Sequence, residues 1–282
     1  MADVVFLLGC AALIIPTMIG VARFSWTTEQ GGHGPIVLAT GIWLLLREIK
    51  DARAERTAPK RPWIAALGIA FFLAVFIVAR ITGILEIEAM TMYPALLLGI
   101  YLLVGGQFMR AIWFPLVYLA LVLPPPDSVV AAITQPIKIA ISEWAVALLH
   151  AFGYPIASSG VNIYIAQFEL LVAAACAGLN SIISLGAICL FYVYLRHRNN
   201  VVAFLLVSLA VIPVAIFSNF VRVIVLILIT YYLGEAAAQG FLHDFAGLLM
   251  FAVALATIFA LDSLYGRIAA RRSRRSARPV PA

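Results

Sequence analysis

The chain has 282 residues, of which 64% are hydrophobic and only 11% charged, and its mean hydropathy is +1.06. A typical soluble domain is about 45–50% apolar and about 25% charged. This composition excludes a soluble enzyme, a disordered protein and, despite the net charge of +6, a nucleic-acid binder. The chain is therefore expected to be an integral membrane protein.

The apolar stretches predict an all-α fold of about eight transmembrane helices in a single polytopic domain, 1–282. A helix needs roughly 20 apolar residues to cross about 30 Å of hydrocarbon. The first stretch is expected to be an uncleaved span, and the second and fifth are short. In chain order the predicted spans are 4–22, 34–46, 63–80, 93–109, 111–123, 175–195, 201–222 and 244–264.

The basic residues orient these spans, because Lys and Arg collect on the cytoplasmic side of a membrane. With eight spans and both termini in the cytoplasm, fifteen of the nineteen basic residues fall on that side. They occupy the loop 47–61, Arg110, the loop 196–198 and the tail. The tail, 265–282, is expected to be a basic cytoplasmic anchor beside anionic lipid headgroups. The remaining basic residues are Arg23, Arg80, Lys138 and Arg222.

One long region that is not expected to span the membrane, about 124–174, lies on the outer side. Pro124-Pro125-Pro126-Asp127 ends the fifth span. Residues 128–152 have the pattern of an amphipathic helix, which would lie on the membrane surface or pack as a partial span. Residues 161–167 are β-prone and predict a short strand or a β-hairpin.

Cys176 is the first candidate for chemistry. Counting back from the cytoplasmic end of its span places it at the outer interface, near the start of a helix. The positive end of a helix dipole stabilises a thiolate, and the surrounding small residues leave room for a substrate. Cys10 and Cys189 are expected to be packed hydrophobic side chains, and three cysteines with this spacing form neither a disulfide framework nor a zinc site.

Arg222 and His243 are predicted to lie at the same face of the membrane. Arg222 is about 31 Å along its helix from the cytoplasmic side and lies between two apolar stretches. Asn219, one turn earlier, could orient it. His243 directly precedes the last span, with Asp244 beside it as a helix cap.

A Cys, an Arg and a His together can carry out acyl transfer. The His activates the thiol, or holds it as an ion pair, and later protonates the leaving amine. The Cys attacks a carbonyl and forms a thioester, while the Arg stabilises the oxyanion or positions the substrate. No Gly-x-Ser-x-Gly motif is present and the other histidines are scattered, so we expect neither a serine triad nor a metal, and no cofactor.

Three other functions stay open on the residues alone. The chain could be a transporter or channel with Cys176 merely packed, but the polar residues collect at one end of the spans. It could be an enzyme acting on polyprenyl-linked glycans, although such a site would need more outer-face Lys, Arg and Asp. It could also be a catalytically inactive scaffold.

At these residues the sequence resembles the exosortase/archaeosortase family of multi-pass membrane cysteine transpeptidases. The family pattern is a Cys, a small residue and Gly, then Asn-x-x-Arg, then a His with Gly four residues later. The matching segments are Cys176-Ala177-Gly178, Asn219-Phe220-Val221-Arg222 and His243-Asp244-Phe245-Ala246-Gly247. The resemblance covers about 90–262. Many members carry Ser where this chain has Ala177, and the soluble C-terminal domain of some members has no counterpart here.

The resemblance implies a function and a set of roles. Cys176 would be the nucleophile, His243 the general base and acid, and Arg222 the oxyanion or substrate-positioning group, supported by Asn219, Gly178, Asn180 and Asp244. The substrate would be an exported protein with a C-terminal sorting tail, which consists of a short motif (often Pro-Glu-Pro), a hydrophobic span and a basic end.

By the same resemblance, the tail would be cleaved on the outer face of the cytoplasmic (inner) membrane, which is its periplasmic or extracellular side. The new carboxyl terminus would pass to an amine-bearing acceptor, which could be linked to lipid or glycan. Residues 128–152 and 161–167 could form walls for the motif.

Overall fold

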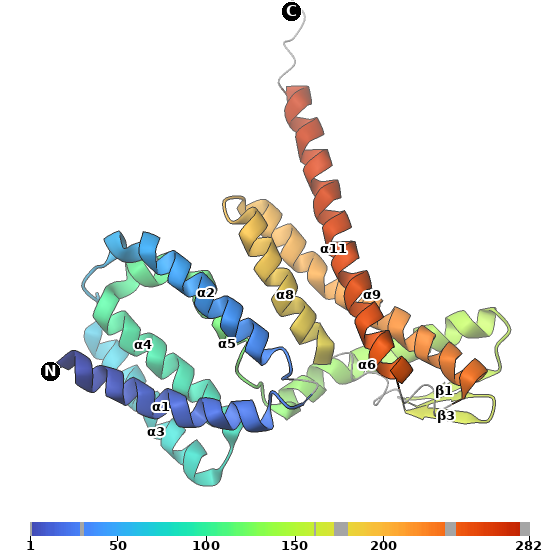
Figure 1. Ribbon diagram of the computed structural model, residues 1–282, viewed down its shortest axis with the longest axis horizontal. Coiled ribbons are helices and arrows are strands. Elements are labelled where there is room, and N and C mark those ends of the chain that lie inside the picture. Colours follow the sequence, from blue (N-terminus) through green and yellow to red (C-terminus); the bar gives the residue numbers. More distant parts are fainter. Residues whose placement is uncertain (1, 29–30, 161, 172–179, 235–240, 277–282) are drawn as a thin grey trace, which may run out of the picture. The chain divides into compact units, whose positions relative to one another are not determined.

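The computed structural model describes residues 2–28, 31–160, 162–171, 180–234 and 241–276 (Figure 1). The chain forms two compact units, Met1–Ala132 and Ile133–Ala282. The boundary between them falls inside helix α6, Asp127–Ala151.

The first unit is a group of helices held together by apolar contacts. Helix α4 is central to it and packs against α3 and α1, while α2 packs against α5. Its elements are α1 (Ala2–Phe24), α2 (Gly34–Ala52), the 3-10 helix η1 (Arg53–Glu55), α3 (Pro62–Thr82), α4 (Leu85–Ala111) and α5 (Trp113–Ala120).

A glycine bends α4 where the segment after η1 crosses it. Gly105 has φ 78° and ψ 175°, which is not helical. A Cβ at this position would lie 1.9 Å from the carbonyl oxygen of Thr57, whose own N–H donates to the carbonyl of Val104 at 3.2 Å. Only glycine tolerates both the positive φ and this close approach. The bend therefore depends on the sequence at this one residue.

Glu88 is a buried carboxylate in the interior of the first unit. Glu88 of α4 accepts a hydrogen bond from the Thr17 hydroxyl of α1 at 2.7 Å and one from Arg80 of α3 at 2.7 Å. The Arg80 side chain is 48% exposed and that of Glu88 only 9%. This network links three helices and compensates the burial of the carboxylate.

The second unit contains α6 from Ile133 onward, a small sheet and three long helices. The sheet comprises β1 (Ile156–Ser159), β2 (Asn162–Ile165) and β3 (Phe168–Leu171). The helices are α8 (Asn180–His197), α9 (Val201–Leu233) and α11 (Phe241–Ser276).

The sheet is an antiparallel meander in the order β1-β2-β3. Ser159 pairs with Asn162 and Ile165 with Phe168, so both connections are two-residue turns. Such turns need a positive φ, which Gly160 adopts at 61° and Ala166 at 50°. The predicted strand or hairpin at 161–167 is thus confirmed as a strand, with a further strand on each side of it; Val161 lies outside the described residues.

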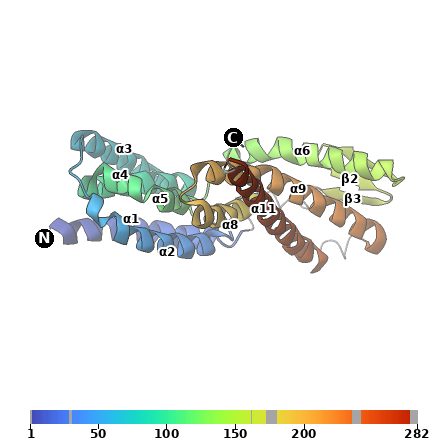
Figure 2. The ribbon, with the colours of Figure 1, turned by 90° about the horizontal axis from the view of Figure 1, so that it is seen from above.

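The C-terminal half of α9 packs against α6 and the sheet (Figure 2). Ile141 and Ala145 of α6, Ile163 of β2, and Val223 and Ile227 of α9 are buried together in this cluster. At its edge the hydroxyls of Tyr154 and Tyr232 are 2.8 Å apart, and Tyr231 packs edge-on to both rings.

Six helices in the described part of the chain are long and apolar enough to cross a membrane. They are Phe6–Phe24, Pro62–Thr82, Leu85–Ala111, Asp127–Ala151, Val201–Leu233 and Phe251–Ile268. The all-α membrane fold is thereby confirmed, whereas the count of eight spans and the cytoplasmic termini stay predictions.

Two of the predicted spans, and one region that was not predicted to span, need comment. In the stretch 111–123, helix α5 has only eight residues, or about 12 Å of helix, and turns begin directly after it. This helix is too short to cross a membrane. Helix α2 continues through the charged residues at 47–51, which dilute its apolar character. Conversely, 127–151 is apolar enough to span, although its pattern predicted a surface helix or a partial span.

Candidate active site

A short band of polar side chains is buried in the middle of the second unit. Ser218 and Asn219 are fully buried, and Arg222 is only 5% exposed. All three belong to α9, and residues three or four apart on a helix share a face. Burying a guanidinium group in an apolar helix is costly, so such a residue is a functional candidate.

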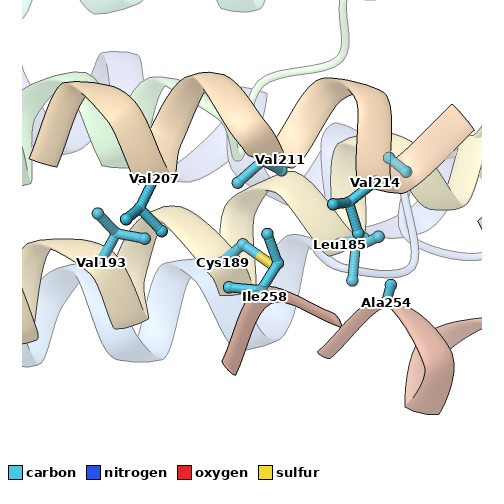
Figure 3. Close-up of a cluster of buried hydrophobic side chains, with 9 residues drawn as sticks. Leu185, Cys189, Val193, Val207, Val211, Val214, Ala254 and Ile258 are labelled. Atoms are coloured by element: carbon cyan, nitrogen blue, oxygen red, sulfur yellow. The ribbon is translucent and has the colours of Figure 1, made fainter. Parts of the chain in front are cut away.

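The band lies between two apolar clusters of α9. Beyond it, Val223 and Ile227 pack against α6 and the sheet. Before it, α9 packs against α8 and α11 in a second cluster (Figure 3). That cluster contains Leu185, Cys189, Val193, Val207, Val211, Val214, Ala215, Ala254 and Ile258.

Figure 3 shows how this three-helix cluster is layered. Cys189 of α8 lies in one layer with Val211 of α9 and Ile258 of α11. In the next layer, Leu185 lies with Val214 and Ala254. From the first layer to the second, the residue numbers decrease in α8 and α11 and increase in α9. Helices α8 and α11 therefore run in the same direction, and α9 is antiparallel to them.

The layering fixes the levels of the predicted site residues. From the layer of Leu185, Asn180 lies about 8 Å further along α8, at a rise of 1.5 Å per residue. Arg222 lies about 12 Å further along α9, and His243 about 17 Å further along α11. Arg222 is therefore within about 5 Å of the levels of Asn180 and His243.

The structure describes the predicted residues to different extents. Arg222 and Asn219 are described in full, on one face of α9. Asn180 opens α8, and His243 and Asp244 lie in the first turn of α11; for these three the described part is the backbone. Cys176 and Gly178 lie outside the described residues, in the segment 172–179 between β3 and α8.

Two comparisons with known proteins find no counterpart, since neither the curated proteins nor the solved structures contain a match. The third comparison gives a clear result. The sequence model of the transmembrane exosortase family, Exosortase_EpsH, matches residues 26–260. The chain belongs to this family.

Membership of the exosortase family supports a role in the sorting and processing of proteins at a membrane. The matched range includes the positions of Cys176, Asn219, Arg222 and His243. It also begins well before residue 90, where the resemblance seen in the sequence became specific. Helices α2 and α3 are therefore part of the exosortase domain and not an unrelated addition.

The sequence pattern did not single out one polar cluster of this exosortase. Asp262 of α11 is 7% exposed and lies in the candidate span Phe251–Ile268. It contacts His197 and Tyr192 of α8. The sequence feature that could have identified this cluster is Asp262 itself, because an acidic residue inside an apolar stretch is a functional candidate by default. In the described part of the chain, no three His, Cys, Asp or Glu side chains gather to hold a metal ion.

Proposed function

We propose that this exosortase is a membrane-embedded cysteine endopeptidase and transpeptidase that acts on the C-terminal sorting tails of exported proteins. The observation that carries the proposal is the buried polar band of α9. In this band, Arg222 lies within about 5 Å of the level of Asn180, where α8 begins, and of that of His243 in the first turn of α11. One of these helices follows Cys176 by four residues in the sequence, and the other carries His243.

In the proposed first step, the thiolate of Cys176 attacks the carbonyl carbon of the scissile peptide bond. A C–S bond forms and negative charge develops on the carbonyl oxygen. Arg222 is suited to this charge because a guanidinium group in a buried site stabilises an oxyanion far more than it would in water. His243 then gives a proton to the leaving amine, the C–N bond breaks, and a thioester on Cys176 remains.

In the second step, an amine-bearing acceptor attacks the thioester and transfers a proton to His243. A new amide forms, the C–S bond breaks, and the thiolate is regenerated. Asn219 would hold the Arg222 side chain in place, one turn away on the same helix. The sheet and α6, which pack against the same half of α9, are the proposed walls for the sorting motif.

The proposal predicts the outcome of one cysteine replacement. Cells that carry the exosortase and a candidate protein with a sorting tail should stop processing that protein when Cys176→Ala is introduced. The protein should then keep its full size on an immunoblot. Cys189→Ala is the matched control, because Cys189 is fully buried in the apolar cluster of α8. Unchanged processing by the Cys176→Ala variant would rule the mechanism out.

The thioester can be tested separately. Hydroxylamine is a strong nucleophile that cleaves thioesters, so it should release a substrate-derived hydroxamate from the wild-type enzyme. The Cys176→Ala variant, which has no nucleophile at this position, should give no hydroxylamine-sensitive adduct. An adduct that persists in this variant would place the nucleophile at another residue.

A further inference from the structure

The polar cluster around Asp262 links the two helices that carry the proposed nucleophile segment and His243. The ring of His197, through Nε2, is 2.5 Å from Oδ1 of Asp262. The hydroxyl of Tyr192 donates to Oδ2 of the same carboxylate at 2.7 Å. Nε of Arg196 lies 3.8 Å from Oδ2, and the ring of Tyr265 packs edge-on to His197.

The members of the cluster that make the shortest hydrogen bonds are also the most buried. The His197 and Asp262 side chains are 13% and 8% exposed, whereas that of Arg196 is 67% exposed. Hydrogen bonds to an ionised carboxylate are roughly twice as strong as neutral ones, and more so away from water. The exposed Arg196 contributes little by comparison. His197 and Tyr192 therefore add strong polar contacts to the apolar packing of α8 against α11.

The cluster lies far from the proposed site along both helices, at the end of α8 and in the interior of α11. Asn180 precedes His197 by 17 residues, or about 26 Å of helix. His243 precedes Asp262 by 19 residues, or about 29 Å. Because the two helices run in the same direction, a contact between His197 and Asp262 also sets how far the start of one helix lies from the start of the other along their axes.

We propose that His197, Tyr192 and Asp262 form a positioning clamp that sets the axial register of α8 against α11. On the proposed function, the clamp thereby aligns the segment of Cys176 with His243. The apolar attraction between these helices is non-directional, whereas the carboxylate has one arrangement that satisfies both donors. A shift of about 1 Å at a reacting pair can cost as much as a hundredfold in rate.

The kinetic test uses graded variants in the full-length enzyme in lipid nanodiscs, with a synthetic peptide corresponding to a sorting tail. Asp262→Ala should lower kcat at least tenfold, with KM changed less than about twofold. Tyr192→Phe and His197→Leu should have intermediate effects. His197→Gln, which keeps a hydrogen-bond donor, should recover much of the loss seen for His197→Leu.

Thr257→Val is the matched control. Thr257 lies five residues before Asp262 on α11, and its hydroxyl donates to the carbonyl of Val253 within the same helix. Its loss should leave kcat unchanged. A general loosening of α11 would instead lower the activity of this variant as well, and it would show no recovery by His197→Gln.

A second measurement does not depend on activity. Leu185→Cys and Ala254→Cys place thiols in one layer of the α8–α11 packing (Figure 3). With the three native cysteines replaced by alanine, the rate of oxidative disulfide formation reports the register of the two helices. Asp262→Ala should slow this trapping, and Thr257→Val should not.

The two tests separate the clamp from the proposed function. Normal trapping together with normal kcat in the Asp262→Ala variant would overturn the clamp, even if Cys176→Ala abolishes processing. Slowed trapping in an enzyme whose processing is insensitive to Cys176→Ala would keep the clamp and overturn the proposed function.

Discussion

The two units of the chain each bury a charged side chain, but they do so for different reasons. Glu88 in the first unit accepts hydrogen bonds from Thr17 and Arg80, so three helices share one charge. Arg222 in the second unit lies on the same helix face as Asn219, within about 5 Å of the levels of Asn180 and His243. The first arrangement is a connection between helices, whereas the second is the centre of the catalytic site that we propose.

The first unit also has an apolar groove that lacks the groups needed for catalysis. A groove of about 650 Å³ between α1, α3 and α4 is lined by apolar and small residues, including Cys10 and Gly99. Nothing in it could activate a nucleophile or stabilise a charge. A buried charge is therefore not by itself the mark of a functional site. The residues around it decide whether it connects helices, as Glu88 does, or is a candidate for catalysis, as Arg222 is.

The largest expected effect is the loss of processing activity when Arg222 of the second unit is replaced. Arg222→Ala should lower the rate of tail processing at least a hundredfold, because removing one oxyanion donor costs about that much. Arg222→Lys should recover little, since an ammonium group lacks the planar fork of a guanidinium. Processing rates per folded molecule give the measurement, and Arg80→Gln is the control. Retention of a third of the activity by Arg222→Ala would remove this residue from the mechanism.

A smaller effect, on stability, is expected when Glu88 of the first unit is replaced. Glu88→Ala leaves Arg80 and Thr17 without their shared acceptor and should lower the free energy of unfolding by about 1–3 kcal/mol. The half-exposed Arg80 keeps the loss below that of a fully buried pair. Thermal unfolding in detergent measures it, with Glu88→Gln as the milder variant. Processing per folded molecule should be unchanged, and a selective loss of processing would contradict the assignment of Glu88 as a connection.

The smallest effect concerns the start of α9, which carries the polar band. The Asn200 side chain caps this helix by accepting a hydrogen bond from the N–H of Ala203 at 3.1 Å. Asn200→Ala should cost about 1 kcal/mol of stability, and Asn200→Asp should cost less. A urea or thermal titration of the purified protein would detect this. A larger loss for Asn200→Asp than for Asn200→Ala would show that the cap has another role.

Much of the fold followed from the sequence because hydrophobicity dominates a membrane protein. Composition alone predicted helical spans, and the β-prone residues around Asn162 predicted a strand. The two flanking strands were missed, since Ile156–Ser159 and Phe168–Leu171 are short and their pairing depends on turns at Gly160 and Ala166. Strand pairing is a tertiary property that a local pattern does not contain.

The candidate site was predictable in part for a related reason. Counting helical rise from the basic loops gives the depth of Arg222, so its level could be predicted. The contact between His197 and Asp262 joins residues 65 positions apart, and it depends on how α8 and α11 face each other. Rotation about a helix axis is set by packing, and the nearly uniform apolar surfaces of these helices do not reveal it.

The length of α9 has a consequence for the membrane itself. Its 33 residues extend about 50 Å, whereas the hydrocarbon layer is about 30 Å thick. A tilt of about 20° shortens the projection only slightly, so part of the helix must extend into the headgroup layer, where tyrosines such as Tyr231 and Tyr232 are favoured. Hydrophobic mismatch of this size makes the thickness of the host bilayer a determinant of how deeply Arg222 sits.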